Sequence, residues 1–203
     1  RVRKMHSSYR STFRTIGDTP IARVTRDSFT PIKKGYNHRR KDKELTIKPY
    51  FSDTVTMLYY YTGMKPDVMM SMVDMGYKGI VIIGTGLGHV NKELYPALEY
   101  AKEKGVSVFM TLQTIWGYVH MFVYDTGRDM MAKGVIPLKN MLPETAYVKL
   151  GWILGQTDDP EKVKEMMLTP ISSDMTEREP YNGYLVYQGG SSEIEDFVKR
   201  VHK

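Results

Sequence analysis

The chain of 203 residues contains no cysteine. Disulfide bonds, thiolate nucleophiles and cysteine-ligated metals are therefore excluded, and this composition is compatible with a cytoplasmic protein. The sequence has no apolar run of about eighteen residues, so it predicts no membrane-spanning helix. The first residues, Arg1-Val2-Arg3-Lys4-Met5, also lack the apolar stretch of a signal peptide.

Several catalytic motifs are missing as well. The sequence has no Gly-x-Ser-x-Gly, which argues against an α/β-hydrolase, and no Gly-Lys-Ser/Thr of a Walker loop. A zinc site is not expected, because neither H-x-x-x-H nor H-E-x-x-H spacing occurs among the five histidines, at positions 6, 38, 89, 120 and 202.

Charge is distributed unevenly along the chain. Residues 1–50 contain fourteen Lys or Arg and four Asp or Glu, a balance of +10, whereas the whole chain has a net charge of +6. The remaining 153 residues therefore sum to −4. A basic segment of this kind is typical either of a solvated surface or of a nucleic-acid-binding surface, and composition alone leaves both open.

The most informative stretch is an apolar run at 79–83 followed by the glycine loop Gly84-Thr85-Gly86-Leu87-Gly88-His89-Val90. The run predicts a buried parallel strand, and an amphipathic helix is expected over 92–104. In open α/β sheets, ligands bind outside the carboxyl ends of the strands. The G-x-G-x-G spacing differs from the dinucleotide fingerprint, and the next strand, at 106–110, ends without a carboxylate. The loop is therefore either a site for another ligand or a simple connection.

Strands and helices alternate from residue 50 to residue 170. This alternation predicts a small parallel β-sheet with helices on both faces, an α/β fold. The Met-Met pairs at 69–70, 130–131 and 166–167 are expected to fill its core. The predicted strands are 55–61, 79–83, 106–110 and an edge strand at 135–137, and the predicted helices are 67–75, 92–104, 128–133, 143–154 and 160–168.

The pattern divides the chain into three parts. Residues 1–50 are predicted to form a strand, irregular loops and a basic linker. Residues 51–178 are the α/β domain, and residues 179–203 are a polar tail with a flexible joint at 189–192 and a short charged helix at 193–201. Because the chain opens with Arg inside a predicted strand, we expect that it lacks its beginning.

Five segments carry a further pattern, in collinear order from residue 1 to about 178. These segments are 3–13 (RKMHSSYRSTF), 76–90 (GYKGIVIIGTGLGHV), 121–128 (MFVYDTGR), 134–137 (GVIP) and 141–150 (MLPETAYVKL). Together they resemble the two-domain asparaginase/glutaminase family. Residues 4–8 and Thr176-Glu177-Arg178 resemble most closely the D subunits of archaeal glutamyl-tRNA(Gln) amidotransferases. The resemblance implies the C-terminal domain of this fold, preceded by a remnant of the N-terminal domain.

The resemblance also implies a catalytic residue. Members of the family use a threonine nucleophile, a second threonine with a partner aspartate, and a lysine that completes the relay. Lys4 matches that lysine, whereas both threonines and the aspartate would precede Arg1. The isolated chain is therefore expected to be catalytically inactive. Without the resemblance, Lys4 would be read as an exposed basic strand residue among Arg1, Arg3 and Arg10.

The glycine loop has a role in the same resemblance. In the family's homo-oligomers it reaches the active site of a neighbouring subunit. His89 stands where other members have an asparagine that helps to bind the charged end of the substrate, and a histidine can hydrogen-bond a carboxylate. His89 and Gly88 are therefore the candidate substrate-binding residues. Tyr124 replaces a glutamate of some bacterial members, which indicates a packing role with an exposed hydroxyl.

The function implied is that of a glutaminase-type subunit, which releases ammonia from glutamine so that Glu-tRNA(Gln) is converted to Gln-tRNA(Gln). The implied partners are a transamidase (E) subunit, a second copy of the chain in a homodimer, and tRNA through the complex, without a membrane. No cofactor is expected in this chain, whereas the partner subunit would use ATP and magnesium. Two alternatives stay open: a free-standing L-asparaginase, and a non-catalytic interaction domain whose residues 1–50 contact tRNA.

Overall fold

The structure is a computed structural model that describes residues 1–8, 12–36 and 43–179. The chain forms two compact units, of which one contains Arg1–Leu45 and the other is Thr46–Glu177. We call them unit 1 and unit 2. The predicted joint at 189–192 and the predicted helix at 193–201 lie outside the described residues.

Unit 1 is built from two short β-hairpins. Strand β1 (Val2–Lys4) pairs antiparallel with β2 (Phe13–Thr15), and β3 (Ala22–Val24) pairs antiparallel with β4 (Phe29–Pro31). The sequence predicted one strand and irregular loops here, so three strands were missed. Each strand has three residues, which is too short for the alternation of apolar and polar residues to be read.

Unit 2 contains a four-stranded parallel sheet. Its strands are β5 (Val55–Tyr59), β6 (Gly79–Gly84), β7 (Ser107–Leu112) and β8 (Val135–Pro137), in the spatial order β5-β6-β7-β8. The predicted parallel sheet is confirmed, and so is the edge position of 135–137. The central strand β6 is buried along its whole length, because it has a neighbour on each side and helices on each face.

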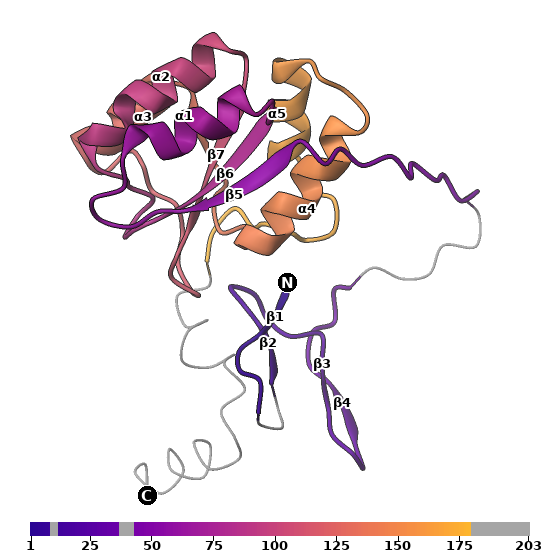
Figure 1. Cartoon of the computed structure of the whole chain (residues 1–203). Coiled ribbons are helices and arrows are strands. Elements are labelled where there is room, and N and C mark those ends of the chain that lie inside the picture. The colour runs from indigo at the N-terminus through magenta and orange to yellow at the C-terminus, as the bar shows by residue number, and fades with distance from the viewer. Residues whose placement is uncertain (9–11, 37–42, 180–203) are drawn as a thin grey trace, which may run out of the picture. The chain divides into compact units, whose positions relative to one another are not determined.

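Helices cover both faces of this sheet (Figure 1). On one face Ile80 and Ile82 of β6 pack in a core with residues of α1, α2 and α3. On the other face Val81 packs with residues of α4 and α5. Successive side chains of a strand point to opposite faces, so one strand supplies both cores. The helices are α1 (Pro66–Asp74), α2 (Tyr95–Glu103), α3 (Asp125–Ala132), α4 (Pro143–Leu154) and α5 (Pro160–Leu168).

The paired methionines serve as core residues. One member of each pair (Met69, Met130 and Met167) is fully buried. The other members (Met70, Met131 and Met166) are partly buried against the same cores. The unbranched methionine side chain fills irregular gaps, and the prediction of a core role is confirmed.

Two helix starts differ from the prediction. The segment expected as a helix from 92 begins with a 3₁₀ turn, η1 (Lys92–Leu94), and the α-helix starts at Tyr95. The proline that follows fits the first turn of a helix, where its missing N–H is not needed. Helix α3 begins at Asp125 rather than at 128, so the residues just before 128 belong to its first turn.

A buried ion pair holds the end of unit 2 to α4. Lys149 Nζ donates hydrogen bonds to Asp174 Oδ2 at 2.6 Å, to the carbonyl oxygen of Met167 at 3.0 Å and to that of Thr169 at 2.7 Å. Burial alone would raise the pKa of Asp174. The hydrogen bonds from Lys149 and from the backbone N–H of Ile171 outweigh that effect, so the pKa lies below its ordinary value. Every hydrogen of the ammonium group is therefore used in fixing the last turn of α5 and the chain that follows it.

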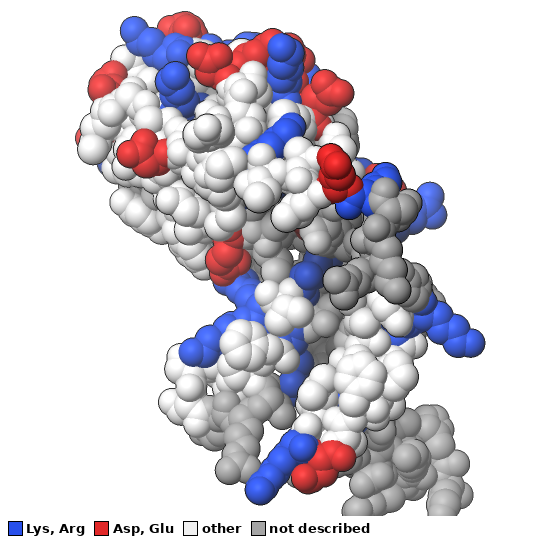
Figure 2. All heavy atoms as spheres, turned by 90° about the vertical axis from the view of Figure 1, so that its right-hand side faces the viewer, with Lys and Arg blue, Asp and Glu red and all other residues white. Residues whose placement is uncertain are grey.

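The surface of unit 2 is charged with both signs. Figure 2 shows acidic and basic side chains interspersed over the face of unit 2 that is turned to the viewer. Within the described ranges, every helix is too short or too polar to cross a membrane.

Candidate functional site

The glycine loop leaves the carboxyl end of β6 as a tight, closed turn. The backbone N–H of Thr85 donates to the carbonyl oxygen of His89 at 2.9 Å, and the N–H of His89 donates to that of Thr85 at 2.9 Å. The hydroxyl of Thr85 adds a hydrogen bond to the same His89 carbonyl at 3.1 Å. His89 is therefore held at its backbone, at the edge of the sheet where open α/β folds bind ligands.

Gly88 lets this turn lie against the sheet. Its φ is 98°, a left-handed conformation that favours glycine. A Cβ atom at this position would lie 2.8 Å from Val119 Cγ1 and 3.0 Å from Met110 Cγ. Its backbone N–H donates to the carbonyl oxygen of Thr85 at 3.0 Å. The geometry thus gives Gly88 a packing and turn role, and its contact with a substrate stays a prediction.

The side chain of His89 has one hydrogen-bond partner and one ring contact. Nδ1 lies 3.1 Å from the hydroxyl oxygen of Thr126. The ring meets that of Tyr124 edge-on, with 5.5 Å between the centroids. Nε2 is inaccessible to solvent and has no hydrogen-bond partner among the described residues. A buried polar atom without a partner is rare in native proteins and calls for an explanation.

The charge state of His89 follows from this environment. Burial lowers the pKa of His89 below its ordinary value, and the nearby carboxylate of Asp125 offsets only part of the effect. The lowered pKa favours the neutral imidazole. A neutral imidazole offers one donor and one acceptor nitrogen, which suits hydrogen bonding rather than ion pairing.

Tyr124 and Thr126 reach His89 from the start of α3. Tyr124 precedes the helix, and 56% of its surface is exposed although its ring contacts His89. This contact agrees with the packing role expected for Tyr124. Sequence reasoning missed Thr126, because the helix was expected to start at 128 and a threonine at a loop end carries no signal of its own. Only the fold brings it to a histidine 37 positions away.

Lys4 lies in unit 1, apart from the glycine loop of unit 2. It is the last residue of β1 and is paired with Phe13 of β2. Its side chain is exposed. The threonines and the aspartate of the implied relay are not among the described residues. The catalytic role of Lys4 therefore stays a prediction.

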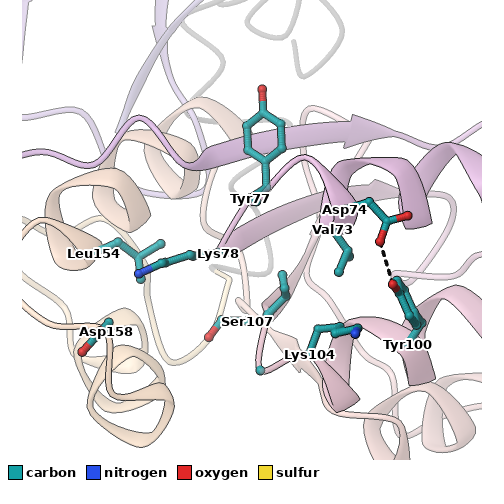
Figure 3. Close-up of a pocket in the computed structure, with 12 residues that line it drawn as sticks. Val73, Asp74, Tyr77, Lys78, Tyr100, Lys104, Ser107, Leu154 and Asp158 are labelled. Atoms are coloured by element: carbon teal, nitrogen blue, oxygen red, sulfur yellow. Dashed lines mark hydrogen bonds between the residues drawn. The ribbon is translucent and has the colours of Figure 1, made fainter.

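A cavity of about 440 Å³ lies at the opposite edge of the sheet, by the amino ends of β6 and β7. Its lining side chains do not converge on one point. Figure 3 shows Lys78 extending toward Leu154, whereas Lys104 extends toward the ring of Tyr100. The hydroxyl of Tyr100 is already used in a hydrogen bond to Asp74 at 2.6 Å. This cavity does not form a site with the glycine loop.

The described residues gather no metal ligands at either edge of the sheet. Within residues 1–8, 12–36 and 43–179, no group of three or more His, Asp or Glu side chains is placed to hold a metal ion. The polar groups that converge at the loop are an imidazole, a hydroxyl and a phenol ring, which can bind and orient an organic ligand.

The fold and the loop define unit 2 as an open α/β domain with a glycine turn at the edge where sheets of this kind bind ligands. Residues 54–167 match the model of the glutaminase/asparaginase C-terminal domain. This match covers more than half of the chain, and the chain belongs to the glutaminase/asparaginase family. The predicted resemblance to this family is thereby confirmed, whereas the roles of Lys4, Gly88 and His89 stay predictions.

Curated relatives are D subunits of glutamyl-tRNA(Gln) amidotransferase from archaea. The subunit from Thermococcus kodakarensis is 47% identical over 184 residues, which are 91% of this chain and 41% of the relative. The subunit from Methanothermobacter thermautotrophicus is 46% identical over 178 residues, which are 88% of this chain and 41% of the relative. The chain thus spans about two fifths of the length of these relatives, and the predicted closeness to D subunits is confirmed.

Solved structures agree on the fold. The thermostable L-asparaginase from Thermococcus kodakarensis superposes with a TM-score of 0.77 at 30% identity, covering 88% of this chain and 54% of that one. L-asparaginase I from Vibrio cholerae gives a TM-score of 0.77 at 26% identity, with coverage of 87% and 53%. The predicted asparaginase-like fold, with strands of an N-terminal remnant before it, is confirmed.

Proposed function

We propose that this chain is part of the glutaminase/asparaginase-like subunit of a tRNA-dependent amidotransferase. The complete subunit would release ammonia from glutamine for the conversion of Glu-tRNA(Gln) to Gln-tRNA(Gln). The observation that carries the proposal is the 47% identity to an amidotransferase D subunit over 91% of the chain. The identity to the L-asparaginase from Thermococcus kodakarensis is lower, at 30%.

The chemistry proposed is nucleophilic. A threonine hydroxyl attacks the carbonyl carbon of the side-chain amide, the C–N bond breaks, and ammonia leaves with the proton that the hydroxyl gave up. Water then releases the acid and restores the threonine. Lys4 would take and return that proton in the relay, which a lysine can do where its surroundings favour the neutral amine.

His89 and Gly88 would help to bind the charged end of the substrate and would take no part in breaking its side-chain amide. In this proposal the glycine loop enters the active site of a neighbouring subunit in a homodimer. A neutral His89 would donate a hydrogen bond to the carboxylate of the amino-acid substrate, and Gly88 would keep the loop in its turn. The place of His89 just beyond the carboxyl end of β6, where open α/β sheets bind ligands, supports this role.

The names of the relatives support a partner subunit in an amidotransferase complex. A transamidase (E) subunit would use the ammonia to amidate Glu-tRNA(Gln), and it would use ATP and magnesium to do so. Contact with tRNA would come through that complex, and the reaction would take place in the cytoplasm. The chain itself would need no cofactor, since its part in the chemistry requires only proton transfer and hydrogen bonds.

An ammonia-release assay on the complete subunit with its partner tests the proposal. Lys4→Ala should lower the rate of ammonia release by about a hundredfold or more, as loss of a general base does. Lys34→Ala is the matched control, since Lys34 is another exposed lysine of unit 1. A Lys4→Ala enzyme that works like the parent would remove Lys4 from the mechanism.

A second candidate function is a free-standing L-asparaginase. It is favoured by the structural match to two L-asparaginases, each with a TM-score of 0.77. Asparagine turnover by the complete subunit, measured without tRNA and without a partner subunit, distinguishes an L-asparaginase from an amidotransferase subunit. Fast turnover of asparagine under those conditions would replace the amidotransferase proposal.

A third candidate is a non-catalytic interaction domain, favoured by the balance of +10 over residues 1–50. This candidate predicts tRNA binding by the chain alone. That binding should weaken steeply with salt, because released counterions drive it. Absence of tRNA binding at low salt would end this alternative. The chain alone is predicted to be catalytically inactive under all three proposals.

A further inference from the structure

The segment that follows α5 is fixed to the rest of unit 2 at two places. We call residues 169–177 the strap. One place is the buried ion pair between Lys149 and Asp174. At the other, the N–H of Thr176 donates to Asn140 Oδ1 at 2.9 Å, and Asn140 Nδ2 donates to the Thr176 hydroxyl at 2.6 Å. Asn140 is buried, so this reciprocal pair of hydrogen bonds is largely shielded from water.

The end of the strap meets a tyrosine in the loop after β7. The hydroxyl of Tyr118 donates a hydrogen bond to the backbone carbonyl oxygen of Glu177 at 3.2 Å. The side chain of Glu177 forms an ion pair with Lys139, which lies two residues after β8. The N–H of Val119 donates to the carbonyl oxygen of Lys139 at 2.9 Å. Tyr118 and Val119 are therefore attached to the strap and to the residue beside it.

The same loop holds the glycine loop. The N–H of His120 donates to the carbonyl oxygen of Leu87 at 2.9 Å. Val119 packs against Gly88, where an added Cβ would lie 2.8 Å from Val119 Cγ1. The ring of Tyr118 stacks on that of His120, with 4.6 Å between the centroids and 29° between the planes. A series of direct contacts thus leads from the strap through Tyr118 and His120 to the glycine loop.

Backbone strain is concentrated along this series. Among the described residues, those other than glycine with φ in the left-handed region are Lys139, at 52°, and Ser173, at 54°. Ser173 lies in the strap and Lys139 is paired with its last residue. Such conformations persist only where the surrounding structure holds them. The strap is therefore held in one defined geometry rather than lying loosely on the surface.

We propose that Tyr118 is a positioning residue, which connects the glycine loop to the strap through its hydrogen bond to Glu177 and so keeps the loop in the shape that binds the amide substrate. The inference rests on the proposed function for the identity of the ligand. It adds a residue that acts through the glycine loop without touching the substrate. It also gives the strap, at the far end of unit 2 in sequence, a role at the carboxyl edge of the sheet.

The first experiment measures amide hydrogen exchange of the ¹⁵N-labelled chain by NMR, without any substrate. Tyr118→Phe removes the hydroxyl and keeps the ring. Exchange of the N–H groups of His120 and Gly88 should become about threefold faster, as for the loss of one hydrogen bond that is partly open to water. The N–H of Ile82, in the buried central strand β6, reports on unfolding of the whole unit and should exchange as in the parent.

The matched control is Tyr100→Phe. It also removes a hydroxyl that makes a hydrogen bond, to Asp74 at 2.6 Å, but at the opposite edge of the sheet. It should leave exchange at His120 and Gly88 unchanged. Exchange in Tyr118→Phe that matches the parent at both loop amides overturns the inference. Equal acceleration at Ile82 also overturns it, since Tyr118 would then stabilise unit 2 as a whole.

A double-mutant cycle tests whether the connection runs through the strap. Thr176→Val removes the hydroxyl that Asn140 holds, so it loosens the end of the strap while Tyr118 stays intact. It should also speed exchange at His120. In the double variant the exchange rate should rise little further, because Tyr118 has no fixed partner once the strap is loose. Effects of the two substitutions that simply multiply would overturn the connection through the strap.

The second experiment measures kinetics on the complete subunit with its partner. Tyr118→Phe should raise KM for the amide substrate about threefold and change kcat less than about twofold, since the loop is displaced and the chemistry is not. Tyr100→Phe should change neither. An unchanged KM in Tyr118→Phe, with faster exchange in the loop, would overturn the positioning role. If the complete subunit hydrolyses no amide while the exchange results hold, the proposed function fails and the connection between strap and glycine loop stands.

Discussion

The two units of the chain bury their apolar side chains in different ways. Unit 2 encloses one core on each face of its sheet, with Ile80 and Ile82 on one side and Val81 on the other. Among the described residues of unit 1, Ile16 has the one buried apolar side chain. Phe13 and Val24 are 66% and 72% exposed.

This difference separates a self-sufficient fold from one that needs support. A two-stranded hairpin is marginally stable in water, and three or more strands or a covering helix are needed for independent stability. Unit 2 meets this condition and carries the glycine loop with its histidine. Unit 1 carries Lys4 on a strand of three residues. The comparison teaches that the fold of unit 2 holds the glycine loop firmly, whereas the strand that carries Lys4 has little packing of its own.

The largest effect on unit 2 is expected from its buried ion pair. Lys149→Met leaves the carboxylate of Asp174 buried without its ammonium partner, which should lower the free energy of unfolding by about 3–5 kcal/mol. Urea unfolding followed by tryptophan fluorescence reports on unit 2, because Trp116 and Trp152 both lie in it.

The double variant Lys149→Met with Asp174→Leu is the control for that experiment. It removes both charges and should regain a large part of the lost stability. A single variant as stable as the parent would show that the ion pair does not hold the chain after α5 in place.

A smaller effect is expected in the glycine loop. Gly88→Ala places a Cβ at 2.8 Å from Val119 Cγ1 in a backbone with φ of 98°. It should lower the free energy of unfolding by about 2 kcal/mol through strain and displacement of the loop. Gly86→Ala, at φ of 53° with no atom within 4 Å, should cost only about half as much, since it adds backbone strain alone. Equal costs would contradict the close packing of Gly88.

Acid should lower the stability of unit 2 by protonating the carboxylate of Asp174. The pKa of Asp174 is below its ordinary value of 3.8 in the folded chain, so the unfolded chain binds the proton more tightly. The ionised carboxylate of Asp174 therefore stabilises the fold above pH 4. This stabilisation is lost as the pH falls through the pKa that Asp174 has in the folded chain. The urea midpoint measured between pH 7 and pH 2.5 should fall in the parent, and it should fall less in Lys149→Met.

The smallest effect is expected when unit 1 is removed altogether. Residues 46–177 should unfold cooperatively, with a free energy of unfolding within about 1 kcal/mol of that of unit 2 in the whole chain, since both cores lie inside this range. Urea unfolding of the two proteins side by side measures it. Failure of 46–177 to fold would contradict the independence of unit 2.

Much of unit 2 could be predicted from the sequence, because its elements carry strong local signals. Helix α4 has Pro143 in its first turn and ends where predicted, and α5 is capped by Asp159, which accepts hydrogen bonds from two backbone N–H groups. The start of α3 carries no such signal, since Tyr124 at its N-cap makes no side-chain hydrogen bond and Gly127 lies within its first turn. For that reason Thr126 was assigned to a loop and its contact with His89 was not foreseen.

The sequence by itself determined the buried strands, the glycine turn and the family, because each of these depends on the kind and spacing of neighbouring residues. Only the tertiary structure decided which atoms surround His89. A parallel sheet brings the loop after β6 and the start of α3 together, although 37 positions of chain separate His89 from Thr126. Such a contact depends on crossover geometry rather than on local pattern.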